Sequence, residues 1–260
     1  MQANSLKQKL SDGKFTCGSW VSLCSPLGAE VMGMVGFDWL LIDMEHGSGD
    51  LQTLIHQLQG IAAAGDTVPI VRVPWNDPVV IKRVLDAGAM GVMVPGVRTV
   101  AEAEQAIAAT RFAPEGIRGV AANTRAARFG LDGEFLATAN GQIALFLQIE
   151  NREAVDNIDP ILDLPGIDVA FIGPNDLSSD MGHRGNAAHP DVQAAIAIVE
   201  QAANARNIPL GTVSRNWEGA AAMVDKGYRA MSIMGDIPLM LQAAQSGVSN
   251  FRKHPRVAGK

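Results

Sequence analysis

The sequence has few cysteines, no long hydrophobic run and no cluster of basic residues. Its two cysteines, Cys17 and Cys24, are too few for a disulfide framework, so we expect reduced thiols in a cytoplasmic protein. No apolar run approaches the roughly 20 residues that span a bilayer, and the polar segment at residues 1–9 lacks the apolar core of a secretory signal. Membrane insertion and export are therefore not expected. The net charge of -6 and the absence of a Lys/Arg run argue against a nucleic-acid partner.

Length and composition indicate one globular domain. Of the 260 residues, 47% are hydrophobic and 18% are charged, which supplies ample material for a core. Barrels of alternating strands and helices commonly have this size as single domains. Because no shift in composition marks a boundary, we predict one domain over residues 1–260.

Short apolar runs alternate with helical patterns along nearly the whole chain, as is typical of repeated βα units. Eight strands are predicted at residues 16–22, 37–43, 69–73, 91–94, 145–150, 167–172, 209–213 and 228–233. Helices are predicted at 5–13, 26–36, from 50, from 78 to 87, 99–109, 190–207, 217–226 and from about 236 to 247, with an irregular connection at 111–142. The pattern predicts a single (β/α)8 TIM barrel.

The predicted strand at residues 145–150 is apolar at its start but carries polar residues toward its end. Gln148 and Glu150 interrupt the run, and a carboxylate at such an exit is costly unless something pairs with it. The next strand ends in Gly173-Pro174-Asn175-Asp176, which places a second acid at a neighbouring exit. Carboxylates with waters and substrate oxygens suit Mg²⁺ or Mn²⁺. We therefore predict a divalent metal site held by Glu150 and Asp176.

More polar groups follow other strands, at the end of the barrel where active sites of this fold lie. Asp43, Glu45 and His46 come after the second strand, and Arg72 ends the third. Histidine has the pKa range that a general base needs, and a fixed positive charge stabilises an enolate. Backbone N–H groups at the helical turn around Asn175 can bind a substrate carboxylate. The set predicts a site for a 2-keto acid.

Six segments carry a resemblance to a known family: LLIDMEHG (40–47), VPIVRVP (68–74), VLDAGAMGVMVPGV (84–97), GIRG (116–119), LQIE (147–150) and GPNDLS (173–178). In these segments the chain resembles the metal-dependent (class II) pyruvate aldolases of the 4-hydroxy-2-oxoheptanedioate and 2-keto-3-deoxy-sugar-acid type. The resemblance implies cleavage of 4-hydroxy-2-keto acids to pyruvate, or a close 2-keto acid, and an aldehyde through a metal-bound enolate. It also implies Mg²⁺, Mn²⁺ or Co²⁺ as cofactor.

The same resemblance assigns catalytic and metal-binding roles. Glu150 and Asp176 would hold the metal, and Arg72 would bind and polarise the keto oxygen of pyruvate. His46 would act through a water as acid and base on the aldol hydroxyl. Asp86, at the end of a predicted helix, would reach His46 from a neighbouring subunit. Family members are typically hexamers, trimers of dimers, whose C-terminal helices exchange between subunits.

Further positions have supporting roles. By the resemblance, Asp43 and Glu45 would orient the histidine and the metal-bound waters, while pyruvate would be positioned by Gln148, Gly173, Pro174 and Asn175. Val213, at the exit of the seventh strand, is expected to form part of the wall of the aldehyde pocket. Two residues depart from the family pattern: Asn175 stands where alanine is usual, and Glu115 interrupts a loop usually richer in proline and glycine.

Other interpretations fit parts of the pattern. Glu150 and Asp176 can form structural ion pairs with Arg72, which can equally clamp Asp43 or Glu45. The same site can serve 2-keto acid decarboxylation or another enolate lysis, and a non-catalytic barrel is a third possibility. A Schiff-base aldolase is not expected because no lysine stands at a strand exit. Four histidines show no metal-ligand spacing and are interpreted as surface or helix residues: His56, His183, His189 and His254.

Overall fold

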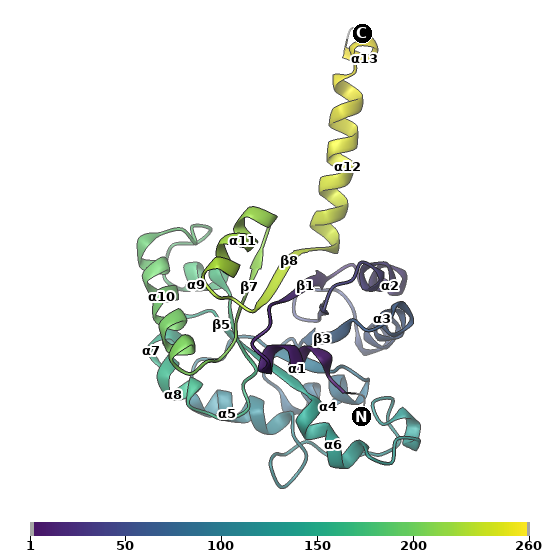
Figure 1. Ribbon diagram of the computed structural model, residues 1–260, viewed down its shortest axis with the longest axis vertical. Coiled ribbons are helices and arrows are strands. Elements are labelled where there is room, and N and C mark those ends of the chain that lie inside the picture. The colour runs from purple at the N-terminus through teal and green to yellow at the C-terminus, as the bar shows by residue number, and fades with distance from the viewer. Residues whose placement is uncertain (1–2, 259–260) are drawn as a thin grey trace.

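Eight parallel strands close into a barrel in the computed structural model of the protein, which describes residues 3–258 (Figure 1). Each strand pairs with the next in chain order, and the eighth pairs with the first. This confirms the predicted TIM barrel. The strands are β1 (Thr16–Val21), β2 (Trp39–Asp43), β3 (Val68–Arg72), β4 (Gly91–Val94), β5 (Ala144–Ile149), β6 (Val169–Ile172), β7 (Leu210–Ser214) and β8 (Ala230–Gly235).

Helices surround the barrel and follow each strand (Figure 1). Thr99 and Glu102 form a reciprocal capping box at the start of one of them, and Asp77 accepts a hydrogen bond from the N–H of Val79 at another. The helices are α1 (Ser5–Ser11), α2 (Pro26–Met34), α3 (Leu51–Ala64), α4 (Pro78–Asp86), α5 (Val100–Ala109), η1 (Arg128–Gly130), α6 (Phe135–Gln142), α7 (Arg152–Asp156), α8 (Ile158–Leu162), α9 (Pro174–Asp180), α10 (Pro190–Ala205), α11 (Trp217–Asp225), α12 (Asp236–Lys253) and α13 (Pro255–Ala258).

Strand residues alternate between the barrel interior and the layer beneath the helices. The interior cluster contains Trp39, Leu41, Ile70, Phe146 and Phe171, and Leu6 and Leu10 of α1 belong to the same cluster. Intervening residues such as Leu40, Ile42 and Leu145 pack in the outer cluster with the helices. The alternation extends to the carboxyl ends of the strands, where it turns five residues toward the barrel mouth: Asp43, Arg72, Gln148, Gly173 and Val213.

Some predicted element bounds are wrong. The connection at 111–142 is not irregular throughout, because its last eight residues form α6. Phe135 of α6 packs edge-on against Phe112, with ring centroids 5.9 Å apart, so this helix depends on a partner distant in sequence. The last long helix continues past Gly247 to Lys253, and β8 begins two residues later than expected.

Helix α12 extends away from the barrel instead of packing along it (Figure 1). It nevertheless has exposed apolar side chains, at Ile237, Met240, Leu241, Val248 and Phe251. Such a helix has a face that needs a partner, so its shape is compatible with the exchange of C-terminal helices between subunits, which stays a prediction. Within residues 3–258, no helix combines the length and apolar character needed to cross a membrane.

Candidate active site at the carboxyl end of the barrel

Arg72 is held rigidly at the end of β3. Its Nε and Nη2 donate to the two carboxylate oxygens of Asp43 at 2.9 and 2.7 Å, across the register pair that joins β2 and β3. Its Nη1 lies 2.9 Å from Oε2 of Glu45, and its guanidinium lies 4.3 Å from the ring centroid of Trp20. A buried, bidentate and stacked guanidinium has one preferred orientation, so the charge of Arg72 is fixed in space.

Asp43 connects this ion pair to the loop that follows β2. Burial raises the pKa of its carboxyl, but the hydrogen bonds and charge of Arg72 and the backbone N–H groups of Glu45 and His46 outweigh burial and lower it overall. Oδ1 accepts from those two N–H groups at 3.1 and 3.3 Å. The side chain of His46 is consequently held at the rim, 68% exposed, with Nε2 3.8 Å from Oε2 of Glu45.

Glu150 is buried just beyond β5 and is close to other acids. Its Oε1 accepts the N–H of Gly96 at 2.7 Å, and its Oε2 accepts from Nε2 of Gln148. Burial is the main cause that raises the pKa of Glu150 to about 7; the charges of Asp176 and Glu45 raise it further, while the Gly96 hydrogen bond and Arg72 lower it. In the absence of a cation this carboxyl therefore holds its proton more tightly than an ordinary glutamate.

Gly173 allows the backbone of β6 to approach Glu150 closely. A Cβ added at this position would lie 2.7 Å from Oε2 of Glu150 and 3.2 Å from Nε2 of Gln148. Any other residue would therefore displace one of these side chains. Pro174 begins α9 in the next position, and Asn175 and Asp176 are exposed in its first turn.

The three carboxyls of Glu45, Glu150 and Asp176 share one region of the mouth. The charge of Asp176 raises the pKa of both Glu45 and Glu150; for Glu45, burial is the largest cause of the upward shift. Among the residues that the structure describes, none donates a hydrogen bond to the buried Oε1 of Gln148. Excess negative charge beside an unpartnered oxygen fits a hard divalent cation, which takes oxygen ligands. The residues present therefore suit the predicted metal.

Asp86 lies away from the other predicted residues. It ends α4, and helices of a barrel run back toward the amino ends of the strands, so Asp86 is at the opposite end from His46. Within the chain it forms an ion pair with the buried Arg118 at 2.7 Å. The predicted contact with His46 therefore needs a second copy of the chain. Glu115 is also remote, accepting a hydrogen bond from Asn140 at 3.2 Å.

Two residues at the mouth were missed by the sequence interpretation. Trp20 stacks on Arg72, and the inward alternation of the first predicted strand was the signal that would have found it. Gly96 donates its backbone N–H to Glu150, and its position directly after the fourth predicted strand was the corresponding signal. Val213, which was predicted, is half-buried against the inner cluster, near the mouth.

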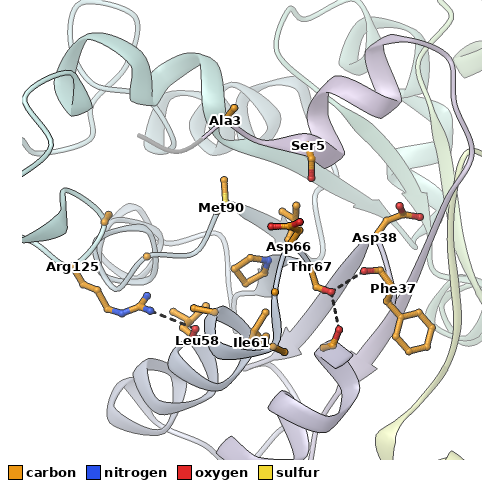
Figure 2. A pocket seen from close by; sticks show the side chains of 18 of the residues that line it. Ala3, Ser5, Phe37, Asp38, Leu58, Ile61, Asp66, Thr67, Met90 and Arg125 are labelled. Carbon is orange, nitrogen blue, oxygen red and sulfur yellow. Dashed lines mark hydrogen bonds between the residues drawn. The ribbon is translucent and has the colours of Figure 1, made fainter. Parts of the chain in front are cut away.

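A cavity of about 1030 Å³ lies at the opposite end of the barrel. It is lined by residues at the amino ends of β2, β3 and β4, including Asp38, Thr67 and Met90 (Figure 2). Figure 2 shows Arg125 reaching the carbonyl oxygen of Leu58, at 3.4 Å. None of the predicted site residues lines this cavity, so its size is not a guide to the catalytic centre.

A group of possible metal ligands spans the connection between α9 and α10 and the first turn of α10. Oδ2 of Asp191 lies 3.4 Å from Nε2 of His183 and 3.7 Å from Nδ1 of His189. The structure thus places His183 and His189 next to each other, which the sequence did not predict. The ring centroids of His183 and His189 lie 3.5 Å apart, and the angle between the ring planes is 13°. Because the rings are nearly parallel, their nitrogen lone pairs do not point toward one common position. His189 Nδ1 also accepts the N–H of Asp191, which makes the group a cap for α10.

Known proteins resemble the chain over nearly its full length. The family model described as HpcH/HpaI aldolase/citrate lyase matches residues 16–243. The 5-keto-4-deoxy-D-glucarate aldolase of Shigella boydii serotype 18 is 40% identical over 250 residues, 96% of this chain and 97% of that protein.

Two solved structures are similar as well. An HpcH/HpaI aldolase/citrate lyase family protein from Burkholderia cenocepacia is 39% identical with a TM-score of 0.94, covering 96% of this chain and all of that one. Citrate synthase SbnG is 27% identical with a TM-score of 0.86, covering 95% of this chain and 97% of that one. The resemblance noted in the sequence is confirmed: the chain belongs to the HpcH/HpaI aldolase/citrate lyase family and is a class II aldolase.

Proposed function

We propose that the protein reversibly cleaves 4-hydroxy-2-keto acids to pyruvate, or a close 2-keto acid, and an aldehyde with the help of a divalent metal ion. The observation that carries the proposal is the Arg72 guanidinium, fixed by Asp43 and Glu45 beside the carboxyls of Glu150 and Asp176. The arrangement places one oriented positive charge next to a cluster of oxygen donors. The name of the 40% identical relatives, a keto-sugar-acid aldolase, supports the same reaction class.

Glu150 and Asp176 would hold Mg²⁺, Mn²⁺ or Co²⁺, Glu45 would orient water around it, and Gln148 would help to position pyruvate. A divalent ion bound there supplies Lewis-acid stabilisation of negative charge on the substrate oxygens. The raised pKa of Glu150 fits this role, because a cation replaces the proton that burial otherwise favours.

Arg72 provides the hydrogen bonds for the keto oxygen. A guanidinium has five N–H donors, and the two hydrogen bonds to Asp43 use one on Nε and one on Nη2, so N–H groups remain for substrate. During cleavage the C3–C4 bond breaks, its electron pair moves toward the keto oxygen as an enolate, and the aldehyde leaves. Arg72 stabilises the charge that develops on that oxygen. The substrate carboxylate would meet the backbone at Gly173–Asn175.

His46 is the candidate for proton transfer. The reaction removes the proton of the C4 hydroxyl, and the enolate later takes a proton at C3 to give pyruvate. The imidazole is exposed at the rim, with its Nε2 3.8 Å from Oε2 of Glu45, where it can reach both solvent and a bound substrate. We propose that the transfer runs through a water.

We also propose a homohexamer in which α12 packs on a neighbouring subunit and Asp86 of one subunit approaches His46 of another. The exposed apolar face of α12 supports this assembly. Because Asp86 ends α4, at the end of the barrel opposite His46, a contact between the two would need a second subunit. The ion pair of Asp86 with Arg118 would then orient its carboxylate at a subunit contact.

A second enolate reaction is the alternative. Citrate synthase SbnG shares the fold at 27% identity, so the scaffold supports more than one chemistry in related chains. The same carboxylates and arginine fit 2-keto acid decarboxylation or another enolate lysis. Analysis of products separates these reactions, because only aldol cleavage yields pyruvate and an aldehyde in equal amounts.

The test is pyruvate release, coupled to lactate dehydrogenase, from a panel of 4-hydroxy-2-keto acids. The enzyme is assayed after chelation and after Mg²⁺, Mn²⁺ or Co²⁺ is restored, beside Glu150→Gln and His46→Ala. We expect release that requires metal and that falls by more than about 100-fold in Glu150→Gln. Release that survives chelation would contradict the metal role; no release from any panel member would contradict the aldolase proposal.

A further inference from the structure

The cavity at the amino end of the barrel is large enough to hold a small organic molecule (Figure 2). Its volume is about 1030 Å³, and its lining comes mainly from the loops that precede β2, β3 and β4 and from residues 125–132. Among the residues that the structure describes, those proposed for metal or substrate binding are absent from the lining. A ligand in this cavity would therefore occupy a second site, separate from the catalytic mouth.

Arg125 is a half-buried cation on the wall of this cavity, and contacts on two helices fix its orientation (Figure 2). Its Nη1 donates to the carbonyl oxygen of Ala87 at 2.9 Å, and its Nη2 donates to that of Leu58 at 3.4 Å. A Cβ at Gly88 would overlap Nη1, so this glycine makes room for the guanidinium. Because a guanidinium has five N–H donors, others remain for a ligand.

Within residues 3–258, no carboxylate forms an ion pair with Arg125. Its two carbonyl partners are neutral, and burial lowers the pKa of its guanidinium. Burial also lowers the pKa of Arg118 in the same loop, but there the hydrogen bond and charge of Asp86 act in the opposite direction. A partly buried charge without a counter-charge is costly. An anion that enters the cavity would supply this counter-charge to Arg125.

The acidic side chains that line the cavity do not supply it. Asp38 is paired with Nζ of Lys9 at 2.6 Å. Asp66 is exposed, so solvent screens its charge. Arg128 and Asp132 also line the cavity and add one charge of each sign. The ionised groups of the lining therefore leave room for one further negative charge beside the half-buried cation.

Apolar side chains line the same cavity. Ile61 of α3 and Met90, which precedes β4, form part of its wall (Figure 2). Phe129 and Leu131 also line it, and they are 72% and 83% exposed. Large apolar side chains that stay in water beside a cavity favour a ligand with an apolar body. A bare inorganic ion would leave them uncovered.

We propose that this cavity binds a small organic anion, whose carboxylate or phosphate pairs with Arg125 and whose apolar body packs against Ile61, Met90 and Phe129. The site is independent of aldol cleavage and needs no metal ion. A guanidinium binds carboxylate and phosphate through the same paired N–H groups. The experiment therefore includes both kinds of head group.

Titration calorimetry of the full chain, in the presence of a chelator, compares octanoate, octyl phosphate and the neutral 1-octanol. For at least one of the two anions we expect one site per chain, with 1-octanol bound about 10-fold more weakly or worse. Arg125→Gln should weaken binding of that anion by about 10- to 100-fold and change binding of 1-octanol by less than about threefold. Arg125→Lys keeps the charge and should retain part of the preference.

The matched control is Arg184→Gln, which removes the same charge elsewhere. Arg184 is exposed in the connection between α9 and α10, where its Nε donates to Oγ of Ser179 at 3.5 Å. This variant should change anion binding by less than about threefold. Thermal unfolding without ligand checks that each variant folds, and the comparison of octanoate with 1-octanol on wild type needs no variant. Equal affinity for anion and alcohol, unchanged anion binding in folded Arg125→Gln, or no binding at all would overturn the proposal.

A competition experiment separates this cavity from the catalytic mouth. Saturating pyruvate with Mg²⁺ should leave binding of the anion unchanged, because Arg72 and Arg125 lie at opposite ends of the barrel. Displacement of the anion by pyruvate would place it at Arg72 and overturn the proposal. Because binding is measured without turnover, failure of the proposed aldol cleavage would not affect this result.

Discussion

In the metal-free protein, ionisation of Glu150 should lower the free energy of unfolding as the pH rises. The substitution Glu150→Gln should abolish this contribution to the pH dependence. In the folded chain the pKa of Glu150 is raised from an ordinary 4.5 to about 7, chiefly through burial. Both folded and unfolded chains hold the proton below pH 4.5. Between pH 4.5 and 7 the unfolded chain loses it while the folded chain keeps it, so the free energy of unfolding decreases with rising pH.

The size of the effect follows from the shift. A shift of one pKa unit corresponds to about 1.4 kcal/mol, so a rise from 4.5 to about 7 corresponds to about 3 kcal/mol lost between pH 4.5 and 8. Glutamine does not titrate, and its amide oxygen can still accept the N–H of Gly96. Relative to wild type, metal-free Glu150→Gln should therefore gain about 2 to 3 kcal/mol between pH 5 and pH 8.

Urea unfolding in the presence of a chelator, at pH 5 and pH 8, measures this difference. Saturating Mg²⁺ should reverse the order at pH 8, because the wild-type carboxylate binds the cation and the amide does not. An equal stability difference at both pH values would show that Glu150 titrates normally. It would also contradict the argument that Glu150 belongs to a group of carboxyls that binds a cation.

Three substitutions and one deletion test other parts of the account. Arg72→Lys keeps the charge but loses the bidentate contact with Asp43 and the stacking on Trp20, so kcat/KM should fall by about 100-fold or more. Gly173→Ala should weaken Mn²⁺ binding in titration calorimetry by about tenfold or more, whereas Gly141→Ala, with open space around its Cβ, should not change it. Val213→Ala should alter relative rates across an aldehyde panel more than it alters pyruvate methyl exchange; unchanged relative rates would refute its role. Deletion of residues 237–260 should reduce the mass of the assembly in light scattering.

The barrel could be predicted because its strands are short apolar runs with turn residues at regular intervals. The alternation in β2 and β3 also predicts that Asp43 and Arg72 face the same side, and the structure joins them in one ion pair. Positions near strand exits could thus be identified without knowledge of tertiary contacts.

Other features depend on contacts between distant segments, so the sequence did not reveal them. Helix α6 has little apolar periodicity and forms against Phe112. The stacking of Trp20 on Arg72 joins β1 to β3, and the group formed by His183, His189 and Asp191 depends on the path of one loop. The direction of α12 depends on what packs beside it, which no local pattern encodes.

Deuterium exchange at the methyl group of pyruvate, followed by mass spectrometry, tests the central claim most directly. It reports whether the mouth formed by Arg72, Glu150 and Asp176 generates an enolate with a divalent ion. The account predicts exchange in wild type with Mg²⁺ or Mn²⁺, none above background after chelation, and a loss of more than about 100-fold in Glu150→Gln. Exchange that continues at full rate after chelation, or in Glu150→Gln, would contradict it.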